Sequence, residues 1–300
     1  MLSSGKAPGL SPSPGIWFHT DHLPARDAAA LARSVERHGF SAFWFGEGLG
    51  RDPLAHAAYL LSQTERLVIG TGIASIYSRD PQAMMGGANT LAEQSGGRFI
   101  LGLGVSTPPL VEARGHSFAP PVPAMRSYLR AMQACHYGSC PPPQPVPVVI
   151  AALGPQMIKL AGQEALGAYP CNVTPEFTAQ ARSAMGPDAL LGIQQKVVLE
   201  TSPSRAREIG RAGLALYLAV PHQRKHWERM GFDESDFLNG GSHRLVDGLV
   251  AWGNTEAIRA SIRAHLDAGA NHVCLEPLLP QGEAMPGEEL LEALAYSAGV

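Results

Sequence analysis

Short apolar segments alternate with helix-like segments along almost the whole chain, and this alternation constrains the fold most. Each apolar segment has the length and continuous hydrophobic character of a buried strand and is bounded by turn residues. We expect strands at residues 15–19, 42–46, 67–73, 99–103, 146–151, 168–171, 191–199 and 272–275. Eight strands separated by helices predict a parallel α/β fold, and their number in 300 residues favours a (β/α)8 TIM barrel over a doubly wound sheet.

Three of the expected helices carry recognisable start signals. Asp80-Pro81 and Ser202-Pro203 each place a capping residue before a proline at the first helical position, and Asn254 precedes a third amphipathic segment. These signals strengthen the alternation of strands and helices.

The expected domain organisation is simple. Residues 1–14 are rich in Ser, Gly and Pro and predict a flexible tail, and residues 15–300 predict one domain without internal repeats. Residues 107–147 are rich in proline, so we expect a long loop that folds over the barrel mouth and carries one helix near 125–135. Long loops in compact domains are usually functional or disordered.

Composition limits the partners that the chain can have. The net charge is only −3 and 16% of residues are charged, so no basic field invites nucleic acid. No apolar run approaches the ~18 residues that a membrane span needs, and no signal peptide is visible. We therefore expect a cytoplasmic protein that binds neither nucleic acid nor membrane.

The ligand-forming side chains do not predict a metal site. The four cysteines lack metal-ligand spacing; Cys135 and Cys140 are close enough for a disulfide, although reduced thiols are the favoured state. His222 and His226 stand four residues apart, but no third ligand accompanies them.

Two neighbouring strands end in glycine pairs, at Gly70-Thr71-Gly72 and at Gly102-Leu103-Gly104. Without a Cβ atom, a ligand can approach the backbone closely at these ends, which suggests a cofactor lying across one end of a parallel sheet. A Rossmann-type nucleotide loop is improbable, because a third glycine is missing and Pro108-Pro109 follows where a helix should start.

A third strand end has the features of a phosphate site. After the strand at 146–151 the chain runs through Ala152, Leu153, Gly154 and Pro155 into a helix. The free N–H groups of a helix N-terminus bind phosphate readily. The alternative is a plain strand-to-helix turn.

Two side chains are candidates for catalysis because they end the first two strands, where barrel enzymes place their chemistry. Glu47 follows the aromatic segment 43–45 and can handle a proton or accept hydrogen bonds; His19 ends the first strand. The alternative for Glu47 is a structural carboxylate paired with Arg79 or Arg98.

Several motifs resemble one family. Ser95–Gly104 (SGGRFILGLG), residues 69–73 (IGTGI), Arg79-Asp80-Pro81 and residues 151–155 (AALGP) are similar to signatures of the luciferase-like monooxygenase superfamily, and the last of them to its branch that uses the deazaflavin coenzyme F420. Segments 240–247 and 268–273 also fit that branch.

The resemblance implies a TIM barrel that transfers a hydride between F420 and a small organic substrate. It implies a non-proline cis peptide bond that matches Gly72-Ile73, with this backbone supporting the ring of the cofactor. The polar tail would lie along two strand ends, at Gly104, Val105 and Ser106 and at Ala152, Leu153 and Gly154.

One departure keeps alternatives open. Gly48 stands where some members carry a histidine after the acidic residue of strand two, so Glu47 is left as the nearest protic group. An FMN-dependent monooxygenase that uses oxygen and reduced flavin, and a non-catalytic ligand-binding barrel, are the two alternatives. The resemblance is also compatible with a homodimer.

Overall fold

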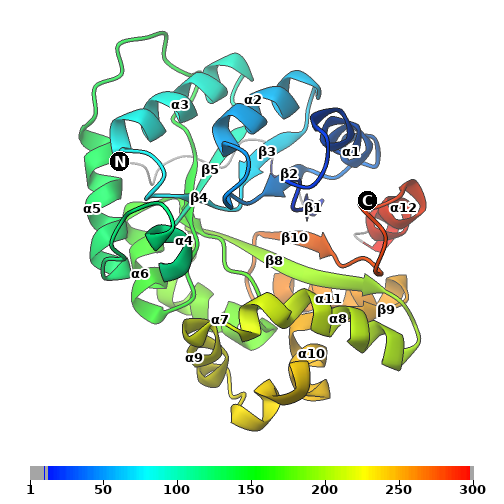
Figure 1. Ribbon diagram of the computed structural model, residues 1–300. Coiled ribbons are helices and arrows are strands. Elements are labelled where there is room, and N and C mark those ends of the chain that lie inside the picture. The colour runs from blue at the N-terminus through cyan, green and yellow to red at the C-terminus, as the bar shows by residue number, and fades with distance from the viewer. Residues whose placement is uncertain (1–9, 11–12, 298–300) are drawn as a thin grey trace.

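The computed structural model describes residue 10 and residues 13–297, and this part of the chain contains a closed barrel of eight parallel strands (Figure 1). The strand order is β10-β1-β2-β3-β5-β6-β7-β8, and pairing of β8 with β10 closes the ring. The barrel strands are β1 (Gly15–Trp17), β2 (Ala42–Phe45), β3 (Val68–Thr71), β5 (Phe99–Gly104), β6 (Val148–Ile150), β7 (Gly167–Ala168), β8 (Leu190–Leu199) and β10 (His272–Pro277). The predicted TIM barrel is confirmed.

Two short strands were not predicted. β4 (Ala74–Ser75) pairs with β5, and β9 (Val250–Gly253) pairs with the end of β8. β4 comes directly after the predicted strand 67–73, and β9 follows α10 without an intervening turn residue, so neither stands out in the sequence as a separate apolar segment.

Helices surround the barrel. They are α1 (Ala25–Arg37), α2 (Pro53–Ser62), α3 (Pro81–Gln94), α4 (Pro108–Glu112), α5 (Pro121–Ala134), α6 (Pro155–Glu164), α7 (Pro175–Met185), α8 (Pro203–Leu218), α9 (Pro221–Arg229), the 3-10 helix η1 (Glu234–Gly240), α10 (His243–Leu249), α11 (Thr255–Asp267) and α12 (Glu288–Ser297). The predicted starts are confirmed: Asp80 accepts a hydrogen bond from the Ala83 N–H, Asn254 caps α11 likewise, and α8 begins after Ser202, whose side chain makes no capping bond.

Aromatic side chains fill the inside of the barrel. The rings of Trp44 and Tyr169 stack with their centroids 4.4 Å apart and pack with Ile100, Val149 and other inward-facing residues. A Cβ atom at Gly70 would lie 2.3 Å from the Trp44 ring, so only glycine fits beside it. The interior below the carboxyl ends of the strands is therefore packed, and a ligand must bind above it.

The prediction for residues 107–147 was wrong in part. Only the first portion lies at the carboxyl ends of the strands, where Arg114 contacts Gly48 and the Ala119 N–H donates to Tyr77. The prolines at 121 and 123 begin α5, which packs against α3 and α6 as an outer barrel helix. Because a helix that follows a strand runs back along it, the remaining residues return to the opposite end of the barrel, with Pro143 near Gly97.

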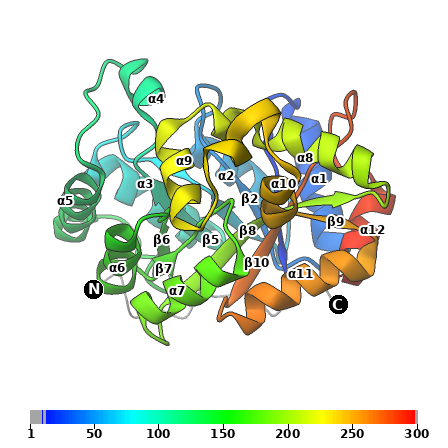
Figure 2. The same ribbon diagram turned by 90° about the horizontal axis from the view of Figure 1, so that it is seen from below.

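Residues 200–249 cover more of the barrel than the first part of residues 107–147 does, and we call them the cap segment. Its α8, α9 and α10 lie together on the side of the barrel that carries β8 (Figures 1 and 2). Buried residues such as Leu214, Trp227 and Leu245 give it an apolar cluster of its own. The Trp227 indole N–H donates to the Asn172 carbonyl at 3.1 Å, which ties α9 to the loop that follows β7.

The predicted flexible tail, residues 1–14, lies mostly outside the described residues. Of its described members, Ser13 and Pro14 accept hydrogen bonds from Ser41, and Leu10 packs against the inner cluster of the barrel. Among the described residues no helix is long and apolar enough to cross a membrane.

Candidate active site

The backbone after β3 bulges at the carboxyl end of the barrel, at the predicted position. The Gly72–Ile73 peptide bond is cis, as the resemblance implies. The Trp17 indole N–H donates to the Gly72 carbonyl at 2.8 Å, and the Glu47 N–H donates to the Ile73 carbonyl at 2.9 Å. Gly72 and Ile73 are partly exposed, so a ligand can reach this backbone.

Glu47 braces the same bulge with its side chain. One carboxylate oxygen accepts the Ser75 N–H at 2.7 Å, and the carboxylate pairs with Arg79 at 3.1 Å and with Arg114 at 3.4 Å. The Glu47 side chain is 2% exposed, so its lone pairs are used inside the protein. The arrangement suits a carboxylate that positions its neighbours.

The arginine partners decide between the structural alternatives for Glu47. Arg79 is its partner, and a second carboxylate, Asp52, holds the other side of that guanidinium. Burial lowers the Arg79 pKa, but the hydrogen bonds and charges of Asp52 and Glu47 together outweigh it, so the pKa is raised. Arg98 is not a partner, because it donates to carbonyl groups including those of Leu61 and Leu67.

His19 lies at the carboxyl end of β1 and is open to solvent. Its side chain is 52% exposed and stacks against the Trp17 ring, with centroids 6.4 Å apart. One ring nitrogen is 3.9 Å from the Asp21 carboxylate. His19 can therefore contact a ligand that lies above Trp17.

The predicted tail-binding residues lie together because β5 and β6 are neighbours. The Ala151 N–H donates to the Leu103 carbonyl at 2.8 Å, which aligns the two strand ends. Val105, Ser106, Leu153 and Gly154 are partly exposed, whereas Gly104 and Ala152 are buried. Ser106 has φ +60, a conformation that is strained for a residue other than glycine and is often found at binding sites.

A polar cluster that was not predicted lies inside the barrel, on β8 and β10. The Lys196 ammonium pairs with the Glu276 carboxylate at 2.5 Å, and the Gln194 amide donates to the same carboxylate at 2.7 Å. The Tyr217 ring of the cap segment covers the ammonium at 4.9 Å. Lys196 is 1% exposed, so the ion pair is shielded from water.

Strand pairing places this ion pair beside Trp17, whose side chain contacts the bulge. Glu276 is the register neighbour of Lys196 on one side, and continuing the pairing of Ile16 with Leu275 brings it beside Trp17 on the other. The Trp17 side chain reaches across to Gly72. A molecule above Trp17 would therefore have the glycine bulge on one side and the polar cluster on the other.

A signal for the polar cluster was present in the sequence. Gln194, Gln195 and Lys196 form a polar run inside an apolar strand, and the two-residue period of a strand places Gln194 and Lys196 on one face and Gln195 on the other. Gly192, two residues earlier, faces Tyr169 inside the barrel, so that face is the inner one. Glu276 was missed because β10 runs two residues beyond its predicted end.

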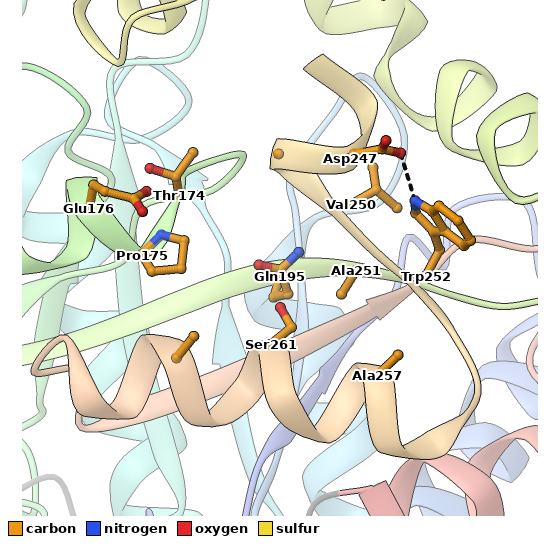
Figure 3. Close-up of a pocket in the computed structure, with 12 residues that line it drawn as sticks. Thr174, Pro175, Glu176, Gln195, Asp247, Val250, Ala251, Trp252, Ala257 and Ser261 are labelled. Carbon is orange, nitrogen blue, oxygen red and sulfur yellow. Dashed lines mark hydrogen bonds between the residues drawn. The ribbon is translucent and has the colours of Figure 1, made fainter. Parts of the chain in front are cut away.

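A separate pocket of about 500 Å³ opens outside the barrel, between α7, β9 and α11 (Figure 3). Gln195 lines it from the outer face of β8 and hydrogen bonds to the buried His265 at 2.7 Å. Burial lowers the pKa of His265 to about 4, so the ring is neutral near pH 7. The predicted site residues do not line this pocket; they lie at the carboxyl ends of the barrel strands.

Comparison with known proteins agrees with the geometry. Of the curated relatives, a Mycobacterium tuberculosis protein named "Putative coenzyme F420-dependent oxidoreductase Rv3520c" is 37% identical over 107 residues, 35% of this chain and 31% of that one. The matched stretch thus spans about a third of that relative's length.

Solved structures share the fold at low sequence identity. An F420-dependent secondary alcohol dehydrogenase in complex with an F420-acetone adduct has a TM-score of 0.74 at 15% identity, covering 95% of this chain and 98% of the other. The oxygenating constituent of 3,6-diketocamphane monooxygenase from Pseudomonas putida, in complex with FMN, has a TM-score of 0.73 at 13% identity, covering 96% and 98%.

The model of one family matches residues 7–272, nearly the whole barrel. Its description is "Luciferase-like monooxygenase", in agreement with the barrel, the bulge after β3 and the glycine-rich strand ends. The chain belongs to the luciferase-like monooxygenase family.

Proposed function

We propose that the protein is an oxidoreductase that transfers a hydride between coenzyme F420 and a small organic substrate. The observation that carries the proposal is the set of partly exposed strand ends around the Gly72–Ile73 bulge, in a chain with F420-linked relatives. FMN is the alternative cofactor, because FMN-dependent enzymes share the fold.

The residues present suit a flat ring with a phosphate-bearing tail. Gly72 and Ile73 offer partly exposed backbone for the ring. Helix α6 begins at Pro155 and is preceded by Gly154, which has no side chain to cap it, so the N-terminal end of the helix is open to an anion. The buried Asn172 side-chain oxygen has no hydrogen-bond partner and lies after β7 at the same end of the barrel. When bound, the deazaflavin supplies a carbon centre that gives or takes a hydride.

The side chains around this space have distinct roles in the proposal. Glu47 positions the bulge through Ser75 and holds Arg79 beside it. His19 contacts the substrate from above Trp17, where its side chain is open to solvent. Tyr217 and Trp17 exclude water from the space above the barrel interior.

Titration of the purified protein with F420 and with FMN, followed by ligand fluorescence, tests the cofactor. We expect the tighter binding with F420. Tight FMN binding without F420 binding would support the monooxygenase. Binding of reduced F420 without its oxidation by any acceptor would favour a non-catalytic barrel. The homodimer and the cytoplasmic location remain predictions from the sequence.

A further inference from the structure

Helix α9 of the cap segment lies over the turn that begins α6. Trp227 anchors this helix to Asn172, and its last residue, Arg229, reaches the other side of the turn. One guanidinium nitrogen of Arg229 lies 3.9 Å from the point where Gly154 would carry a Cβ atom. The cation therefore belongs to the surroundings of the α6 N-terminus.

Arg229 has no carboxylate to neutralise it. Among the described residues, no ion pair or hydrogen bond of its side chain is found, whereas arginines such as Arg207 and Arg244 of the same cap segment are paired with carboxylates. Gly154 precedes α6 without capping it through a side chain. Pro155 has no N–H, and the Met157 and Ile158 N–H groups donate to the Gly154 carbonyl, so Gln156 carries the backbone N–H of this helix end that is left for a ligand. The Arg229 cation lies beside this helix end, where an anion would pair with the guanidinium and accept from the N–H.

Two buried polar side chains of α9 add an independent sign of a missing ligand. Both ring nitrogens of His226 and the amide nitrogen of Gln223 are buried without a hydrogen-bond partner. His226 is 1% exposed, and its ring faces the backbone of Leu153 beside Gly154. Burial lowers the pKa of His226 to about 4, so the ring is neutral near pH 7 and has one N–H and one acceptor nitrogen, of which the Leu153 backbone can pair with only one. Buried polar groups are rarely left unpaired, so the other ring nitrogen and the Gln223 amide indicate a missing partner.

We propose that Arg229 binds the phosphate of the cofactor, so that the cap segment and the barrel share the phosphate site. The α6 N-terminus contributes the Gln156 N–H, and His226 contributes a ring N–H. The ligand chemistry is a flavin-type phosphate ester: the diester of F420 or the monoester of FMN. This inference rests on the proposed function, but it holds for either cofactor.

The test compares ligands with and without phosphate. Dissociation constants of F420, FMN, riboflavin and the phosphate-free F420 chromophore are measured by fluorescence titration for the wild type and for R229A. Arg229→Ala should weaken binding of the phosphate-bearing cofactor about 10-fold and that of its phosphate-free counterpart less than 2-fold. The ratio should shrink at 1 M salt, where the Debye length is about 3 Å.

Two further variants and an unfolding measurement distinguish a direct contact of Arg229 with the phosphate from an effect of net charge and from misfolding. Lys225→Ala removes the same charge from an exposed position one turn earlier on α9 and should change each dissociation constant less than 2-fold. Arg229→Lys keeps the charge but loses the planar fork, and should fall between R229A and the wild type. Thermal unfolding without ligand should be unchanged in R229A, because Arg229 is exposed and unpaired.

The other outcomes distinguish the role of Arg229 from the proposed function. Equal weakening of phosphate-bearing and phosphate-free ligands, or no weakening, would overturn the role of Arg229 while leaving the proposed function intact. A wild-type protein that binds neither F420 nor FMN would overturn both. Preference for F420 or for FMN in the wild type identifies which phosphate ester Arg229 contacts.

Discussion

Lys196 and Glu276 form an ion pair inside the barrel, and their stepwise neutralisation tests how this site is held together. Lys196 is 1% exposed, and Glu276 accepts hydrogen bonds from both Lys196 and Gln194. Removing one member of a buried pair leaves an uncompensated charge and costs about 3–5 kcal/mol. Replacing both members by neutral residues is often nearly free of cost.

The surroundings of Lys196 and Glu276 narrow the expected loss of stability for each variant. In K196M the Glu276 carboxylate keeps its hydrogen bond from Gln194 and an exposed fraction of 11%. We therefore expect the free energy of unfolding to fall by about 3 kcal/mol, the lower end of the range for a broken buried pair. E276Q leaves the ammonium with the Tyr217 ring, which can return only about 2 kcal/mol, so the loss should again be about 3 kcal/mol. The double variant should lie within about 1 kcal/mol of the wild type.

Urea unfolding at pH 7, followed by circular dichroism, measures these differences by linear extrapolation. Arg66→Met serves as the control, because its pair with Glu65 is exposed at 74% and 85% and should contribute less than about 0.5 kcal/mol. Additive losses in the double variant, near 6 kcal/mol by the values above, would refute the reasoning. So would a single-variant loss as small as that of the control.

Three further predictions concern stability. A Cβ atom at Gly102 would lie 1.9 Å from the Thr71 carbonyl oxygen, so G102A should lower the free energy of unfolding by about 2–3 kcal/mol, measured by thermal unfolding. The control G86A places a Cβ atom in open space on helix α3 and should raise the free energy of unfolding by up to about 1 kcal/mol. E47A should cost about 3 kcal/mol in urea and E47Q about half as much, because glutamine keeps an acceptor oxygen; equal losses would contradict this. Burial lowers the pKa of His265 to about 4 in the folded state, against about 6.5 when unfolded, so His265 should contribute up to about 3 kcal/mol to the stability lost as the pH drops from 6.5 to 4. The pKa values of His56, His226 and His272 are lowered to about 4 as well and add to this loss, so in urea unfolding H265N should reduce the pH dependence without abolishing it.

The barrel and its functional end could be predicted because their signals are local. A buried strand is a short apolar run, a helix start is a capping residue, and glycines at Gly72 and Gly104 mark strand ends wherever those strands pair. Parallel strands then bring their carboxyl ends together, so Gly72, Ser106 and Gly154 lie at one end of the barrel. Their roles in binding remain predictions.

The partners of charged residues could not be predicted in the same way. Arg79 and Arg98 were both candidates for Glu47, and they differ only in which carbonyl or carboxylate groups the folded chain places within reach. Lys196 and Glu276 are 80 residues apart, and only closure of the barrel by β8 and β10 makes them neighbours.

The sequence by itself determined the class of fold, the strand ends around which we propose the site, and the family, because these depend on short-range patterns of apolar residues and glycines. The tertiary structure alone decided what covers that site. The helices of the cap segment are amphipathic like those of the outer barrel, so their periodicity shows that one face is buried but not against what. The hydrogen bond from Trp227 to Asn172 and the position of Arg229 beside Gly154 place helix α9 of the cap segment over the carboxyl ends of β6 and β7.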